Sequence, residues 1–288
     1  MKKNGYGAGL VALLLFMLSQ TGKATPTAYV LRFSDVPALQ QAANSHHAYV
    51  YTPLDEPEAP AAPAVDWLKA QGWKQVWPLL HPTDKFLTFA GPHTQRYLRI
   101  ATEDNYYIWT RRLEVDPQQL PILELTWGVE RFPTGAALDL YRANDRALAV
   151  LVFFGEKVSA GGVLIPNVPR GLAFFWGETE TVGATYTCVP ARNGPAEVRM
   201  QCKYPHVKYI ALRRGEAGTV HTDRVDLVAL FKQHFPDYWQ QHRRVPPVVA
   251  VSFEAGSNQT HSASLARLYA LVFKPAGAPL LQPAAGSR

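Results

Sequence analysis

YLRIATEDNYYIWTRRLEVDPQQLPILELTWGVERF, residues 97–132, contains two long runs in which apolar and polar residues alternate. A turn-forming segment, Asp116-Pro117-Gln118-Gln119, separates the two runs. A period of two over such lengths predicts two β-strands, each with one buried face. In the second strand one face carries Leu123, Leu125, Trp127 and Val129, and the other carries Glu124, Thr126 and Glu130.

The rest of the chain continues this pattern of short strands and turns, with 23 prolines and 20 glycines available for the turns. Residues 145–154, DRALAVLVFF, are almost continuously apolar and predict a strand buried on both faces. Residues 225–241 have the spacing of an amphipathic helix that breaks near Pro236. Further strands are predicted at 28–33, 85–90, 171–176, 184–189, 198–204, 206–213, 248–253 and 265–273.

Many strands, few helices and no regular alternation of the two indicate a mainly β protein. We predict an antiparallel β-sandwich, jelly-roll-like in the manner of galactose-binding and carbohydrate-binding modules, with a few short helices. The predicted parts are a signal peptide at 1–24, an N-terminal extension with a Pro/Ala-rich linker at 25–62, the sandwich at 63–275 and a flexible tail at 276–288.

The first 24 residues have the features of a secretory signal. Lys2 and Lys3 precede a short apolar run at 9–18, and Gly22 and Ala24 occupy the minus-three and minus-one positions of a cleavage site. The run is too short to span a bilayer comfortably, and an uncleaved membrane anchor is the alternative. We therefore expect a periplasmic or secreted protein without a stable membrane anchor after cleavage.

The charge of the chain depends partly on that signal. The formal net charge is +6, and removal of the signal, which holds three lysines and no acidic residue, leaves +3. Arg213-Arg214 and Arg243-Arg244 are isolated pairs rather than a basic stripe. We therefore expect no nucleic-acid partner.

Export also bears on the two cysteines, Cys188 and Cys202. An oxidising compartment favours a disulfide between them, which would close a loop rich in turn-forming residues. Such a bond would stabilise the fold by roughly 3 kcal/mol in the chain-entropy model. The alternative is two separate buried thiols, and no motif around either residue indicates catalysis.

Four segments, in their order along the chain, carry a family resemblance. They are LEVDPQQLPILELTW at 113–127, Asn144-Asp145 before an apolar strand, Phe174-Phe175-Trp176, and EAGSNQTH at 254–261. Over residues 65–274 the chain resembles a bacterial family known as domain of unknown function 3047. The resemblance implies a sandwich similar to carbohydrate-binding jelly rolls in exported proteins, and no established reaction.

The chain departs from the family pattern at several polar positions. Asn144 replaces one acid of a pair, and Ala149 occupies the place where the family pattern leads us to expect an arginine. The late loop has Ser257, Asn258 and Gln259 where the family commonly has aspartates. The resemblance therefore implies a divergent member, with a polar site that is altered or inactive.

Candidate ligand-binding residues come from the aromatic and polar segments. Tyr106 faces away from Tyr107 and Trp109 on its strand, so it is the better candidate for a surface ring on which a sugar stacks. Asn144, Asp145 and Asn258 supply oxygens and amides for hydrogen bonds to a ligand. The alternative is that the aromatic residues fill the core and the polar residues form turns.

Candidate catalytic carboxylates are few. Glu124 and Glu130 lie roughly 20 Å apart on one strand, beyond the about 5–9.5 Å that a glycosidase pair requires. Glu178 and Glu180 pass this test at roughly 7 Å, and Asp145 is a third candidate. Asn144-Asp145 and Glu103-Asp104-Asn105 also suit Ca²⁺, but no histidine spacing indicates a metal site, and we expect no metal or cofactor.

The sequence therefore favours a noncatalytic binding module for glycan or another cell-envelope component. A carbohydrate-active hydrolase or lyase is the first alternative, with Glu178, Glu180 or Asp145 as its catalytic residues. A structural or assembly module of the envelope is the second. The absence of any recognisable catalytic motif favours a protein that is not an enzyme.

Overall fold

The computed structural model describes residues 28–33, 62–76, 83, 85–91, 95–140, 142–159, 167–187, 189–190, 200–201 and 206–278. The predicted signal peptide, nearly all of the linker, both cysteines and residues 279–288 lie outside these ranges. The predicted disulfide and the predicted cleavage site therefore stay predictions.

The first sheet contains seven strands, all paired antiparallel, in the order β14-β7-β16-β5-β4-β2 with β1 paired to β16. Its strands are β1 (Tyr29–Arg32), β2 (Ala62–Pro63), β4 (Leu87–Ala90), β5 (Tyr97–Glu103), β7 (Ile122–Arg131), β14 (Val220–Asp226) and β16 (Ala263–Lys274).

The second sheet also contains seven strands, in the order β10-β13-β9-β8-β15-β6-β3. They are β3 (Trp73–Val76), β6 (Tyr106–Val115), β8 (Arg146–Val158), β9 (Val168–Gly177), β10 (Thr185–Tyr186), β13 (Val207–Arg214) and β15 (Val248–Gly256). One pair, β13 with β9, is parallel, a detail that the predicted antiparallel sandwich did not contain.

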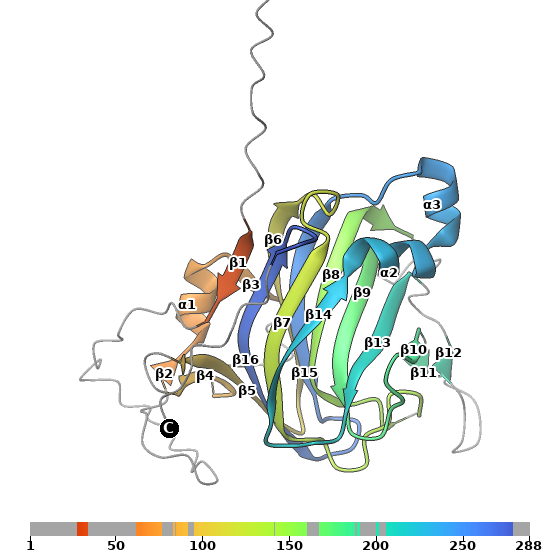
Figure 1. The fold of residues 1–288 in the computed structure, drawn as a ribbon. Coiled ribbons are helices and arrows are strands. Elements are labelled where there is room, and N and C mark those ends of the chain that lie inside the picture. The colour runs from red at the N-terminus through yellow and green to blue at the C-terminus, as the bar shows by residue number, and fades with distance from the viewer. Residues whose placement is uncertain are drawn as a thin grey trace, which may run out of the picture.

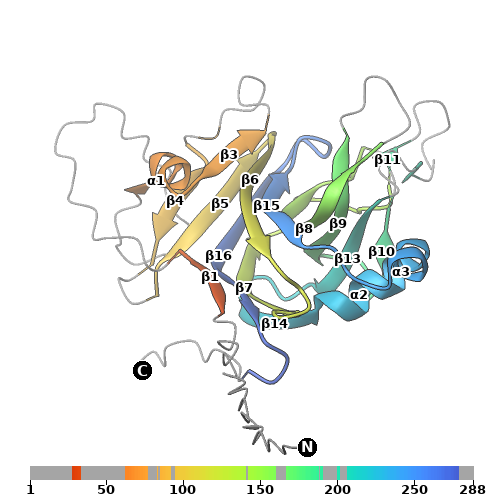
Figure 2. The same ribbon diagram turned by 90° about the horizontal axis from the view of Figure 1, so that it is seen from above.

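The chain crosses repeatedly between the sheets, as in a jelly roll: β5 is followed by β6 in the other sheet, β7 by β8, β13 by β14 and β15 by β16. Figures 1 and 2 show the two sheets packed face to face. A separate two-stranded sheet pairs β11 (Val189–Pro190) with β12 (Met200–Gln201). The protein is therefore a mainly β, jelly-roll-like sandwich, as the sequence predicted.

Three short helices lie at the sides of the sandwich. The helix α1 (Val65–Ala70) lies beside β3, while α2 (Leu227–His234) and α3 (Pro236–His242) lie at the opposite side, near β13 and β14 (Figure 2). The Asp226 side chain accepts a hydrogen bond of 2.9 Å from the Ala229 backbone and so caps α2. Pro236 begins α3, where its missing N–H has no cost, which accounts for the predicted break.

The predicted helix nevertheless begins later than its spacing indicated. Residues 220–226 form β14, because they pair with β7 along its whole length. A side-chain hydrogen bond of 2.9 Å between Thr126 and Thr222 accompanies this pairing. Tertiary pairing thus overrides the local helical pattern at Val225 and Asp226, the first two residues of the predicted helix.

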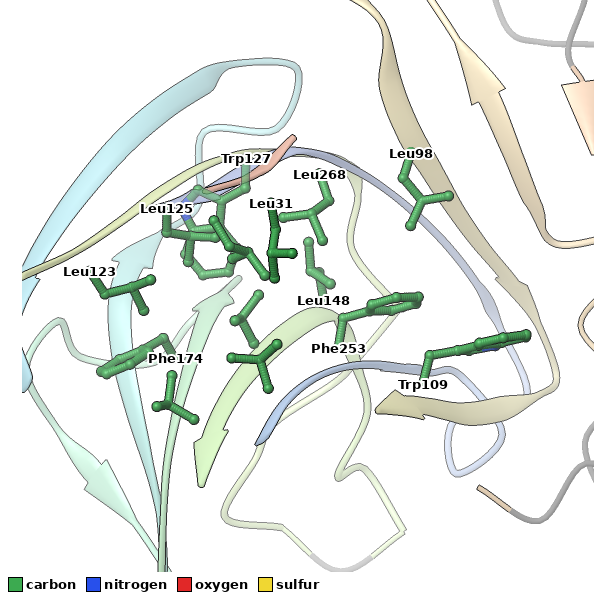
Figure 3. Packing of buried hydrophobic residues seen from close by; sticks show 14 of the residues in the cluster. Leu31, Leu98, Trp109, Leu123, Leu125, Trp127, Leu148, Phe174, Phe253 and Leu268 are labelled. Carbon is green, nitrogen blue, oxygen red and sulfur yellow. The ribbon is translucent and has the colours of Figure 1, made fainter. Parts of the chain in front are cut away.

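The core between the sheets contains the aromatic and aliphatic residues that the alternation pattern predicted. Trp127 of β7 and Trp176 of β9 are buried, with ring centroids 6.0 Å apart. Tyr107 and Trp109 of β6 are also fully buried. Figure 3 shows Leu123, Leu125 and Trp127 of one sheet facing Leu148, Phe174 and Phe253 of the other.

Strand β8 is buried on both faces, as its continuous apolar run predicted. Leu148, Val150 and Val152 belong to the core between the sheets. Ala149 and Leu151 belong to a second, smaller cluster on the opposite face. The outer face of the second sheet is therefore partly apolar and buried, and this face carries the candidate site.

We predict that Phe253→Ala lowers the free energy of unfolding by about 3–5 kcal/mol, because the side chain is fully buried and packs on Trp73 with ring centroids 5.2 Å apart. Val220→Ala, at an exposed end of β14, should change it by less than about 0.5 kcal/mol. Urea unfolding followed by tryptophan fluorescence measures both. Equal effects of the two substitutions would contradict the packing described here.

Candidate functional site

The candidate site lies on the outer face of the second sheet, away from the core between the sheets. The apolar part of this face is the smaller cluster, which we call the outer cluster. Its buried members are Leu138, Ala149, Leu151, Ala173, Phe175, Val207 and Ala211, with Phe153, Val168, Tyr186 and Tyr209 half-buried around them. Polar residues next to this cluster form the rest of the site.

A buried ion pair is the centre of the site. Arg146 Nε lies 2.6 Å from Glu254 Oε1, and only 9% and 1% of the two side chains are exposed. Phe253 and Ala255 of β15 point into the core, so the alternation of the strand places Glu254 on the outer face. Arg146 is the first residue of β8 and is paired with Gly256 of β15, so the two charges come from neighbouring strands.

Two tyrosines complete this centre. Tyr106 of β6 donates a hydrogen bond of 3.0 Å from its hydroxyl to Glu254 Oε2. The Arg146 guanidinium lies over the Tyr209 ring, 4.9 Å from its centroid, and 5.9 Å from that of Tyr106. Such cation–π contacts stabilise a charge that has left water. We call Tyr106, Arg146, Tyr209 and Glu254 the central cluster.

Gly256 allows Tyr106 to reach the carboxylate. A Cβ at this position would lie 2.8 Å from Cδ2 of the Tyr106 ring, which is closer than side chains tolerate. The ring therefore lies directly against the backbone of β15. A larger residue at 256 would displace the ring and break its hydrogen bond to Glu254.

The two tyrosine hydroxyls of the central cluster are neutral. Burial, followed by the nearby charge of Glu254, raises the pKa of both Tyr106 and Tyr209 well above the usual value. Each hydroxyl keeps its proton, that of Tyr106 donates to Glu254, and both oxygens keep lone pairs that can accept a hydrogen bond from a ligand.

Arg146 stays charged for a related reason. Burial by itself lowers the pKa of Arg146, but Glu254 and the two tyrosines outweigh it, so the pKa is raised above its ordinary value. A raised pKa means that the stabilisation by the pair is present throughout the range below that ordinary value. It is lost only as the pH rises through the raised pKa, so the pair persists at every physiological pH.

The predicted ligand-binding residues gather at one end of the central cluster. Arg146 Nη1 donates to Asn144 Oδ1 at 2.8 Å. Asp145 Oδ2 accepts from the backbone and the hydroxyl of Thr260, at 2.7 and 2.8 Å, which holds the loop that contains Asn258. Tyr106, which the sequence predicted to be a surface ring, is half-buried. The four predicted residues come from three separate parts of the chain.

The predicted catalytic carboxylates do not form a pair with Glu254. Glu180 is buried and accepts from the backbone N–H groups of Leu138 at 2.8 Å and Thr179 at 3.2 Å. Glu178 is exposed just beyond β9. Asp145 is held by Thr260, as described above. Glu180 and Asp145 therefore organise loops.

Sequence reasoning missed the two charged residues at the centre of the site. Glu254 begins the segment EAGSNQTH but was not among the candidate residues. Arg146 was not among them either, because the family pattern predicted an arginine at the position of Ala149, three residues later. The available signal was a charge beside a continuous apolar run, Arg146 before 147–154 and Glu254 after 248–253, because a charge buried in a strand requires a partner. Their pairing depends on the register of β8 against β15.

Within the described ranges, no group of three His, Cys, Asp or Glu side chains forms a possible metal site. The two acidic segments considered for Ca²⁺ are engaged otherwise, since Asp104 Oδ1 lies 3.0 Å from His261 Nδ1 and Asp145 accepts from Thr260. No helix in the described part of the chain is long and apolar enough to cross a membrane.

Comparisons with known proteins agree with the family resemblance. The profile of the family described as "Protein of unknown function (DUF3047)" matches residues 72–272. No curated protein sequence matches the chain. Several solved structures align loosely with it.

One such structure is endoglucanase 3 of family GH12 from Trichoderma harzianum, with 11% identity, 64% of this chain and 80% of that chain covered, and a TM-score of 0.31. Another is the xyloglucanase domain of the effector NopAA from Sinorhizobium fredii, in complex with cellobiose (9% identity, 69% and 97% covered, TM-score 0.32). A third is a family 11 xylanase from Neocallimastix patriciarum (12% identity, 70% and 99% covered, TM-score 0.24). At these values the alignments transfer no residue, substrate or activity to this chain.

We predict that Arg146→Met destabilises the protein by about 3–5 kcal/mol, because it leaves the Glu254 charge buried without its partner. The double variant R146M/E254Q keeps an acceptor for the Tyr106 hydroxyl, removes the stranded charge and should recover most of the loss. Urea unfolding measures all three proteins, and a single variant as stable as the parent would exclude a buried pair.

Proposed function

We propose that this chain, which belongs to the family described as protein of unknown function (DUF3047), is a noncatalytic carbohydrate-binding protein. The ligand would lie on the outer face of the second sheet, over the central cluster. The observation that carries the proposal is the combination of half-buried tyrosine rings with a charge-balanced, hydrogen-bonded polar centre on one sheet face.

The aromatic part of the argument concerns the rings around the central cluster. Tyr106, Phe153, Tyr186 and Tyr209 are all half-buried on or beside this face. The apolar faces of sugar rings pack on aromatic side chains, while polar neighbours orient the sugar hydroxyls. A β-sheet holds such rings rigidly, so little conformational entropy would be lost on binding.

The polar part concerns hydrogen bonding. The tyrosine hydroxyls of the central cluster remain protonated, and that of Tyr106 donates to Glu254, so their oxygens can accept hydrogen bonds from sugar hydroxyls. Asn144 lies at one end of this cluster, where it accepts from Arg146, and the loop that contains Asn258 is held next to it through Thr260 and Asp145. The amides of both residues can supply donors and acceptors. The site thus contains the neutral hydrogen-bonding groups that a sugar requires.

The charge balance favours binding over hydrolysis. A glycosidase uses two carboxylates about 5–9.5 Å apart on either side of the scissile bond. In the described part of the chain, Glu254 is the carboxylate that contacts Arg146 and Tyr106. Arg146 balances its charge, and the neighbouring carboxylate of Asp145 accepts from the backbone and the hydroxyl of Thr260, so both carboxylates are already held by protein groups.

We further propose that the protein acts after export, in the periplasm or outside the cell, where glycans of the envelope are its ligands. The features that support this are the N-terminal signal pattern and the pair of cysteines. Fractionation of cells that produce the tagged full chain would test it. Recovery of the unprocessed protein in the cytoplasm would contradict export.

We predict that a screen of neutral oligosaccharides against the exported protein identifies a ligand, and that Tyr209→Phe weakens its binding roughly tenfold. The substitution keeps the ring and removes one hydroxyl, so the loss corresponds to one hydrogen bond at a buried polar site. Isothermal titration calorimetry measures the affinity of each protein.

Tyr29→Phe is the matched control, because Tyr29 is half-buried in the first sheet and packs on Phe273. It should bind as the parent does. A ligand whose affinity is the same for the parent and Tyr209→Phe would place the site elsewhere. Hydrolysis of the bound sugar would contradict the noncatalytic assignment.

A further inference from the structure

A second surface, separate from the central cluster, combines basic and aromatic side chains. Arg170 lies on β9 and Lys208 on β13, and α2 and α3 lie beside these strands (Figure 2). The basic patch, as we call it, comprises Arg170, His206, Lys208, Lys232 and His234, together with the rings of Tyr238 and Trp239. Two β-strands and two helices therefore contribute to one surface.

Ring contacts hold the basic patch together. The Arg170 guanidinium lies 4.5 Å from the centroid of the Tyr238 ring, and the Lys232 ammonium lies 4.2 Å from that of Trp239. Tyr238 in turn packs edge-on against Phe231, which is buried in the core. The positions of these cations are thus set by rings that are anchored to the core.

The basic patch carries an excess of positive charge among the described residues. In the part of the chain that the structure describes, none of Arg170, Lys208 and Lys232 forms an ion pair with an acidic side chain. Asp237 is the one acidic residue within α2 and α3, and it is exposed. Cations gathered in this way repel one another unless an anion joins them.

The pKa values of the two histidines of the basic patch, His206 and His234, are both lowered. Burial, followed by the charges of Arg170 and Lys208, lowers the pKa of His206. Burial, followed by the charge of Lys208, lowers that of His234. Both shifts have the direction expected where positive charge is not compensated.

We propose that the basic patch binds an acidic polysaccharide, whose carboxylates pair with Arg170, Lys208 and Lys232 while a sugar ring packs beside Trp239. Carboxylates repeated along a polymer match cations that are spread over two strands and two helices. This surface goes beyond the neutral-sugar site, because it uses different residues and recognises charge.

The exposure of the apolar side chains favours a soluble polymer over a membrane surface. A segment that inserts into a bilayer presents protruding apolar side chains beside its basic ones. The large hydrophobic side chains exposed within the described ranges are Val30, Leu140, Val182 and Val220, none of which belongs to the basic patch. Tyr238 and Trp239 are half-buried and lie beneath cations.

Affinity electrophoresis with alginate, a polyuronate, tests the proposal on the whole exported chain. The parent should be retarded by alginate and not by dextran, and added salt should weaken the retardation because it screens charges. K208Q/K232Q should bind alginate about tenfold more weakly, since it removes charge-assisted hydrogen bonds. The control K74Q/R214Q removes two exposed charges elsewhere and should bind as the parent does.

Thermal unfolding of each variant separates a loss of binding from a loss of folding. Tyr209→Phe should leave alginate binding unchanged, so failure of this proposal and failure of the neutral-sugar site are distinguishable. Equal weakening by K208Q/K232Q and K74Q/R214Q would overturn the proposal. Tighter binding to phosphatidylglycerol vesicles or to a DNA duplex than to alginate would overturn it as well.

Discussion

Apolar side chains cover both faces of β8, with Leu148 and Val150 in the core between the sheets and Ala149 and Leu151 in the outer cluster. This double burial constrains the rest of the second sheet. Residues 146–152 of this strand are buried, so a polar group among them needs a partner within the protein. Arg146 and Glu254 satisfy that requirement through each other, and their neighbours are arranged around them.

The buried pair also determines what the site can do. Its charges balance, so the free energy lost on leaving water is offset by a short ion pair, a tyrosine hydrogen bond and cation–π contacts. The groups left to meet a ligand are neutral hydroxyls, amides and ring faces. These are the groups that the proposed carbohydrate-binding function would use for sugar hydroxyls and apolar sugar faces.

The first sheet also pairs charges between neighbouring strands. Glu124 pairs with Lys274 at 2.6 Å and Glu130 with Arg267 at 2.6 Å, both across neighbouring strands. At the edge of the sandwich, Asp223 accepts from Trp127 and from Arg213, so a carboxylate of one sheet joins an arginine of the other. In the basic patch, by contrast, three cations have no such partner among the described residues, and this contrast makes that surface a candidate for an external anion.

The sequence by itself determined the class of the fold and most of its strands. Alternation is a local property, and burial of one face forces Leu123, Leu125 and Trp127 to one side whatever the strand order. It also placed Tyr106, Asn144, Asp145 and Asn258 among the polar candidates, and the structure brings them to one end of the central cluster. Only the tertiary structure decided that Arg146 meets Glu254, that β13 runs parallel to β9, and that residues 220–226 extend as a strand. Each of these depends on pairing between segments up to 108 residues apart, and no local pattern contains that register.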